Sequence, residues 1–305
     1  MLSRIFISVF VLSPLAFAGI IQDVRLSISQ NNFAGADAQL KTYRAQHGID
    51  PEYLEALSWM GRGSLEAGKL DQADIYAKQT KILTVEYTRT RKLDSDPHLG
   101  IALGAAFEVE AQVLGQRNRR SEAVALLKRA MAAYDHTSIH ARLQKNLNIL
   151  SLTGQPAPAL EMAEHLGPQP VSLSKLRGAP VLLFFWAHWC ADCKAEAPII
   201  ERLRTEYAPK GLTVAGPTQF YGYVARGEEA APQQELAYIE SVRQRYYSGL
   251  LDMPVPVSNA NFDAYGASTT PTIVLLDRAG RVALYHPGTM PYEELRAAIE
   301  AAARP

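Results

Sequence analysis

The chain has 305 residues, of which 48% are hydrophobic and 20% charged, a composition typical of a globular protein with about two domains. Its 31 Lys and Arg residues equal its 31 Asp and Glu residues, so it has no overall charge that would attract nucleic acid. We therefore expect no nucleic-acid partner.

The N-terminal segment is similar to a secretory signal peptide. Arg4 precedes an apolar stretch that begins at Ile5, and Ala16 and Ala18 supply the small residues of an A-x-A cleavage site. The stretch is shorter than the roughly 20 residues that cross a bilayer. We expect cleavage after Ala18 and an exported protein, periplasmic or otherwise extracytoplasmic. The alternative is an uncleaved N-terminal membrane anchor, because the segment has a single positive charge before its apolar stretch.

Residues 19–153 predict an all-α domain, because they are rich in Ala, Leu, Gln and Glu and show helical periodicity with few prolines. Two pairs of helices meet at turns in residues 53–77 and 100–134, and the second helix of another pair is recognisable at residues 32–40. The small-residue positions resemble a tetratricopeptide repeat, with an insertion near residues 89–97. Such an array predicts a surface that binds a protein or peptide; the alternative is a helical domain whose residues only pack.

Residues 154–158 are a proline-rich break, and an α/β domain is predicted from there to residue 305. A β-hairpin connection is expected at residues 277–280. The other expected elements, in chain order, are a strand at 181–186, a helix at 191–207 interrupted by Pro198, a strand at 212–215, a helix at 233–247, strands at 272–276 and 282–285, and a helix at 292–303.

The chain has two cysteines, Cys190 and Cys193, which directly follow the apolar run 181–189. At a strand-to-helix turn, the helix N-terminus favours the thiolate of the first cysteine. We predict a redox-active dithiol in which Cys190 is the nucleophile and Cys193 the resolving thiol.

Two other roles for the cysteine pair are disfavoured. Structural zinc needs about four N or S ligands, but there is no second cysteine pair and the seven histidines are scattered. A structural disulfide that closes so short a loop removes little entropy from the unfolded chain. We expect neither a metal nor a cofactor.

Residues 154–305 resemble the TlpA-like family of exported thiol-disulfide oxidoreductases with a thioredoxin fold. The matching motifs are an entry motif at 154–158, a first hairpin at 173–178, the active-site signature at 185–194 and the Thr-Pro-Thr motif at 270–272. The resemblance implies that Pro271 is cis and faces the dithiol, where it and Thr270 bind the incoming substrate. Trp189 is expected on the surface of the same site.

Two residues differ between this chain and thioredoxins. Thioredoxins carry a buried carboxylate six residues before the first cysteine, where this chain has Phe184. Glu196 matches a glutamate of family members concerned with cytochrome c maturation. It can share a helix face with Cys193 and accept the proton of the resolving thiol. The alternative is an ordinary solvated helix glutamate.

The charges near the dithiol favour a reductase. Asp192 adds a negative group, and like-charge repulsion disfavours a thiolate and hence stabilises the disulfide form. A protonated His188 would have the opposite effect, but we expect this residue at the rim of the site. Residues 216–264 are predicted to be either a wall of the site that faces its partner or an exposed insertion.

The sequence thus predicts an enzyme that reduces protein disulfides, including the haem-binding cysteines of apocytochromes, and that a membrane thiol donor reduces again. Three alternatives remain. One is a disulfide-generating oxidase. Another is a thiol peroxidase, which would need Thr or Ser where this chain has Ala187. The third is a non-catalytic helical-repeat module that binds proteins.

Overall fold

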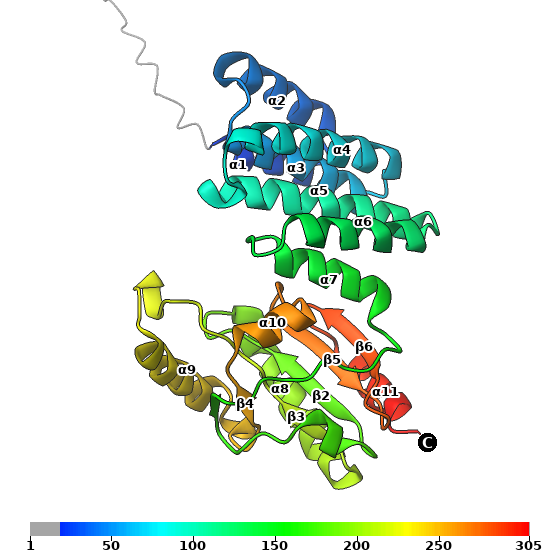
Figure 1. Cartoon of the computed structure of the whole chain (residues 1–305), viewed down its shortest axis with the longest axis vertical. Helices are drawn as coiled ribbons and strands as arrows, with labels where there is room; N and C mark the ends of the chain where they lie inside the picture. The colour runs from blue at the N-terminus through cyan, green and yellow to red at the C-terminus, as the bar shows by residue number, and fades with distance from the viewer. Residues whose placement is uncertain (1–18, 305) are drawn as a thin grey trace, which may run out of the picture.

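The structure is a computed structural model that describes residues 19–304, so the predicted signal peptide lies outside the described residues. Helices come first in the chain and a sheet-containing half follows (Figure 1). The helices of the first half are α1 (Ile20–Ser29), α2 (Phe33–His47), α3 (Pro51–Glu66), α4 (Leu70–Tyr87), α5 (Pro97–Gln116), α6 (Arg120–Ala133) and α7 (His140–Ser151).

Successive helices of this half pack against each other and are connected by turns. Asp50 accepts a hydrogen bond from the Tyr53 backbone N–H and thereby caps α3, and Gly68 forms the left-handed turn to α4 at φ +71°. The recognisable helix at residues 32–40 belongs to α2, and α1 is its partner. The expected insertion consists of two 3-10 turns, Thr88–Thr90 and Leu93–Ser95. The resemblance to tetratricopeptide repeats stays a prediction.

The second half contains a four-stranded sheet in the order β3-β2-β5-β6, with β2 parallel to β3 and the other pairs antiparallel. A small sheet pairs β1 with β4. The strands are β1 (His165–Leu166), β2 (Val181–Phe185), β3 (Thr213–Ala215), β4 (Val255–Pro256), β5 (Thr272–Leu276) and β6 (Val282–Pro287). The helices are α8 (Ala191–Tyr207), α9 (Pro232–Tyr246), α10 (Asn259–Tyr265) and α11 (Tyr292–Ala302).

Both faces of the sheet are covered, which explains why β2 is apolar at every position. Leu182 and Phe184 point into a core shared with α8, α9 and α11. Val181, Leu183 and Phe185 point into a second core shared with α10. The predicted α/β fold after a helical half is confirmed.

Two local expectations were wrong. Pro198 does not interrupt α8, which runs unbroken through it. Residues 173–178 resemble the family's first hairpin in sequence but form a 3-10 helix at Leu173–Leu176. The short strand β1 lies before this segment and pairs with β4, which is far away in the sequence.

Within residues 19–304, none of the helices combines the length and apolar character that crossing a bilayer requires.

Candidate redox site

Cys190 and Cys193 form a disulfide at the start of α8. Cys190 is the N-cap residue, and its Sγ accepts a hydrogen bond of 2.9 Å from the Cys193 backbone N–H. Cys190 is 3% exposed and Cys193 is fully buried. The helix N-terminus therefore directs a backbone donor at the sulfur of Cys190, and this arrangement stabilises a thiolate there after reduction.

The segment before β5 faces the disulfide. The peptide bond between Thr270 and Pro271 is cis, and the Thr270 carbonyl oxygen lies 3.4 Å from Cys190 Sγ. Thr270 Oγ1 is buried and has no hydrogen-bond partner among the described residues. Trp189 is 49% exposed next to Cys190, whereas Trp186 is fully buried and donates its indole N–H to the Gly216 carbonyl at 2.9 Å. The structure thus brings Trp189, Thr270 and Pro271 around one sulfur.

Glu196 lies one turn after Cys193 on α8 and is 3% exposed, so it is not a solvated helix glutamate. Its Oε1 accepts a hydrogen bond of 3.2 Å from the Met290 backbone N–H. Burial raises the pKa of Glu196, although the Met290 N–H and His286 act in the opposite direction. A buried carboxyl group with a raised pKa is suited to exchange a proton with a neighbouring group.

Below the dithiol the core is aromatic. Phe184 occupies the position of the thioredoxin carboxylate and is fully buried, with its ring 6.4 Å from that of Tyr247. The ring of Tyr247 also lies 4.6 Å from that of Trp186, and its hydroxyl has no hydrogen-bond partner among residues 19–304. Glu196 is therefore the buried carboxylate nearest in sequence to the cysteines, and it lies on the helix rather than on β2.

His188 is 1% exposed, so the expectation that it lies at the rim was wrong. Its Nε2 lies 3.2 Å from Oε1 of Glu235 on α9, which is equally buried. The rings of Tyr221, Tyr223 and Tyr238 meet the imidazole edge-on at 5.3–5.4 Å. Burial lowers the pKa of His188 and outweighs the attraction of Glu235, so the imidazole is neutral at pH 7.

Glu235 connects this histidine to the segment before α9. Its two carboxylate oxygens accept hydrogen bonds from the backbone N–H groups of Tyr221 at 2.6 Å and Gly222 at 2.8 Å. The Tyr221 ring also meets the exposed Trp189 edge-on at 5.6 Å. Tyr221 and Glu235, from the segment 216–264, thus lie against Trp189 and His188, next to Cys190 in sequence; a wall that faces a partner stays a prediction.

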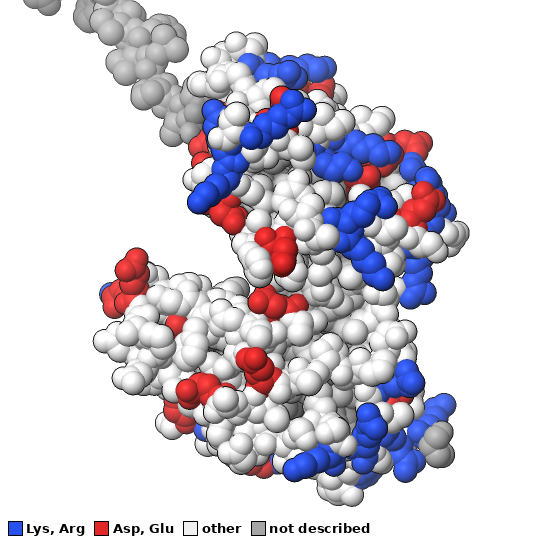
Figure 2. Space-filling model, viewed as in Figure 1, with Lys and Arg blue, Asp and Glu red and all other residues white. Residues whose placement is uncertain are grey.

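The space-filling view shows a hollow between the helical half and the lobe that contains α9 (Figure 2). Lys and Arg gather on the helical half and at the far end of the sheet half, whereas acidic side chains line both sides of the hollow (Figure 2). Dissolved salt screens these exposed charges, so their field extends over roughly 10 Å at moderate ionic strength.

Comparison with known proteins shows the family of the sheet-containing half. The Redoxin family model matches residues 152–301. The thioredoxin-like protein YneN of Bacillus subtilis is 30% identical over 148 residues, which cover 48% of this chain and 78% of YneN. The chain belongs to the TlpA-like thioredoxin-fold thiol-disulfide oxidoreductases. The thiol:disulfide interchange protein DsbE of Xylella fastidiosa is 31% identical over 46% of this chain and 64% of its own length.

A solved structure covers the same half of the chain. The crystal structure of a thioredoxin family protein from Chlorobium tepidum is 19% identical, with a TM-score of 0.38, and covers 49% of this chain and 97% of its own. The family match begins where the helical half ends, so the TlpA-like resemblance is limited to residues that surround the sheet.

Sequence reasoning missed several residues of this TlpA-like site. Glu235 gave no signal, because a single glutamate at the start of an amphipathic helix is ordinary, and only the fold shows that it is buried against His188. Nor did the sequence indicate that Asn148, on the helical half, contacts the segment before Pro271.

Proposed function

We propose that this enzyme reduces protein disulfides through Cys190 and Cys193. The Cys190 thiolate attacks one sulfur of the substrate disulfide, so that a mixed disulfide forms and the other substrate sulfur leaves as a thiolate. The Cys193 thiolate then attacks Cys190 Sγ and releases the second substrate sulfur. The substrate gains two electrons and two protons, and the enzyme is left with its Cys190–Cys193 disulfide.

The observation that supports this mechanism most strongly is the position of Cys190 Sγ. It contacts the Cys193 N–H at the α8 N-terminus and the Thr270 carbonyl oxygen, beside the exposed Trp189. In the proposed substrate complex, the backbone of Thr270, held next to the cis Pro271, pairs with the substrate backbone, and Trp189 covers the residue next to the substrate cysteine. Trp and Tyr provide much contact area at low entropic cost.

Glu196 has the role of proton acceptor for Cys193. It is buried one turn away on the same helix, and its raised pKa matches proton exchange with a thiol better than that of a solvated carboxylate. An ionised Glu196 also disfavours a second negative charge at the dithiol, which stabilises the disulfide form and makes the enzyme a reductant. Asp192 is exposed, so water weakens its contribution.

We propose domain limits at residues 19–153 and 154–305, with the helical domain before the thioredoxin-like one. The biological setting follows the sequence predictions. The enzyme is exported, a thiol donor in the membrane reduces it again, and apocytochrome cysteines are candidate substrates. The names of relatives, such as thiol:disulfide interchange protein, support thiol exchange with other proteins.

The first test is the reduction potential of the Cys190–Cys193 pair in glutathione or dithiothreitol buffers. A value near or below about −270 mV supports a reductase, whereas a value near about −120 mV makes the protein a disulfide donor. Insulin reduction provides the second test. Cys190→Ser should abolish turnover, and Cys193→Ser should accumulate a mixed disulfide that non-reducing gels detect. Equal activity of Cys190→Ser and the wild type would contradict the mechanism.

A further inference from the structure

The helical half contacts the sheet half next to the proposed substrate-binding segment. Helix α7 lies over α10 and β6 (Figure 1). Gly266, at the end of α10, adopts φ +58°, and a Cβ atom there would lie 2.3 Å from the Lys145 backbone nitrogen. The two backbones approach so closely that any side chain at Gly266 would push α7 away.

A buried hydrogen bond joins the two halves at the same place. Asn148 of α7 is 4% exposed, and its Nδ2 donates to the Tyr265 carbonyl oxygen at 2.9 Å. The Tyr285 hydroxyl of β6 donates to the same oxygen at 2.8 Å. This carbonyl therefore has one donor from each half of the molecule, and both donors are buried from water.

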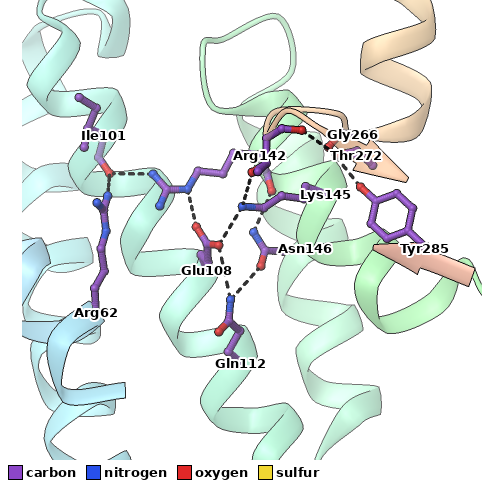
Figure 3. Close-up of polar contacts among 11 residues, drawn as sticks. Arg62, Ile101, Glu108, Gln112, Arg142, Lys145, Asn146, Gly266, Thr272 and Tyr285 are labelled. Atoms are coloured by element: carbon purple, nitrogen blue, oxygen red, sulfur yellow. Dashed lines mark hydrogen bonds and ion pairs between the residues drawn. The ribbon is translucent and has the colours of Figure 1, made fainter. Parts of the chain in front are cut away.

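An ion-pair network supports α7 from the other side. Glu108 of α5 accepts hydrogen bonds from Lys145 Nζ at 2.9 Å and from Arg142 Nε at 2.6 Å (Figure 3). Burial disfavours the charged form of Glu108, but Arg142 and Lys145 outweigh it and lower its pKa, so Glu108 is ionised at neutral pH. Lys145 Nζ also lies 3.5 Å from Thr269 Oγ1, directly before the Thr270–Pro271 bond.

The contact continues to the dithiol within a few residues. The Thr272 hydroxyl donates to the Thr269 carbonyl at 2.6 Å, and the next carbonyl, that of Thr270, faces Cys190 Sγ. Residues 267–269 alone separate Gly266 from Thr270, so a short stretch of backbone connects the α7 contact to the atoms that the proposed function assigns to substrate binding.

We propose that α7 positions the Thr269–Pro271 segment for protein disulfides, with Asn148 as the positioning residue and the helical half as a structural part of the redox site. This inference rests on the proposed function, because it assigns a cause to the substrate-binding geometry of Thr270 and Pro271. A misplacement of about 1 Å can cost as much as 100-fold in rate, so a support that lies outside the thioredoxin-like half can control turnover.

The test compares two buried asparagines of α7. Asn148→Leu removes the donor to Tyr265. Asn146→Leu is the matched control, because Asn146 is 2% exposed on the same helix, and its side-chain hydrogen bonds go to Arg142 and Gln112 within the helical half. Pre-reduced full-length enzyme is mixed with insulin or with the small disulfide 5,5′-dithiobis(2-nitrobenzoate), which is too small to need backbone pairing with Thr270.

We expect Asn148→Leu to lower kcat/KM for insulin about tenfold, because a small misplacement of the substrate-binding segment slows the reaction strongly. The rate with the small disulfide should stay within about twofold of the wild-type rate. Asn146→Leu should lower neither rate by more than about twofold by the same criterion. The inference is wrong if Asn148→Leu leaves insulin reduction unchanged, if it slows both substrates alike, or if Asn146→Leu shows the same selective loss. A wild-type enzyme that does not reduce insulin would instead refute the proposed function.

A second variant covers the case in which Asn148→Leu does not fold. Gly266→Ala places a Cβ against Lys145 and should give the same selective loss with insulin. Gly68→Ala is its control, because Gly68 also has a positive φ, of +71°, but a Cβ atom added there would have nothing within 4 Å. Equal effects of the two alanine variants on insulin reduction would show that backbone strain, and not the α7 contact, causes the loss.

Discussion

Replacement of Glu235 by Gln should destabilise the fold around the dithiol. The carboxylate is 1% exposed and accepts hydrogen bonds from the N–H groups of Tyr221 and Gly222, besides its contact with His188. Glutamine has one acceptor oxygen, so one of the two N–H groups would face an amide N–H instead. A hydrogen bond to a charged group contributes about 1.5–3 kcal/mol, and we therefore expect a loss of about 2 kcal/mol in the free energy of unfolding.

Glu293→Gln is the matched control. Glu293, like Glu235, lies in the first turn of its helix, so both variants lose the same favourable interaction with the helix dipole. The Glu293 side chain is 72% exposed and pairs with Arg296, and such surface pairs contribute roughly 0–1 kcal/mol.

Urea unfolding, followed by tryptophan fluorescence and circular dichroism, measures the unfolding free energy of both variants. The comparison is valid if the slope of this free energy against urea concentration is the same in the variants and the wild type. A Glu235→Gln loss no larger than that of Glu293→Gln would refute the argument. The same variant tests His188, whose pKa burial lowers and Glu235 partly restores. Because the fold binds the neutral imidazole, stability should fall as pH drops through the unfolded-state value of about 6.5, and more steeply in Glu235→Gln.

Three further variants test the site. Glu196→Gln should gain stability relative to the wild type as pH rises above about 4.3, because burial raises the pKa of Glu196 and makes its charge unfavourable in the fold. Urea unfolding at acidic and at neutral pH measures the difference in unfolding free energy between the two proteins. A difference that does not change with pH would contradict this prediction. Tyr247→Phe removes a buried hydroxyl that has no hydrogen-bond partner among the described residues. The unfolding free energy should therefore stay the same or rise by up to about 1 kcal/mol. A clear loss of stability would show that the hydroxyl has a hydrogen-bond partner in solution. Trp189→Ala should raise KM for insulin and change the unfolding free energy by less than about 0.5 kcal/mol, since the side chain is half exposed; an unchanged KM would remove Trp189 from the substrate surface.

Much of the thioredoxin-like half could be predicted because its signals are local. The apolar run that forms β2 has apolar residues at every position, which predicts burial on both faces. The cysteine pair directly follows this run, which predicts its position at a helix N-terminus. The expected exposure of Trp189 on the surface of the site agrees with its half-exposed side chain.

Only the tertiary structure determined the surroundings of the dithiol. His188 is buried because Glu235 and three tyrosines come from an insertion that follows much later in the chain, and no periodicity of the sequence describes such a contact. The contact between Asn148 and Tyr265 spans 117 residues. A pattern of residues predicts which side of an element is buried, but which distant element covers that side depends on how the whole chain packs, and for this protein that packing brings the helical half to the redox site.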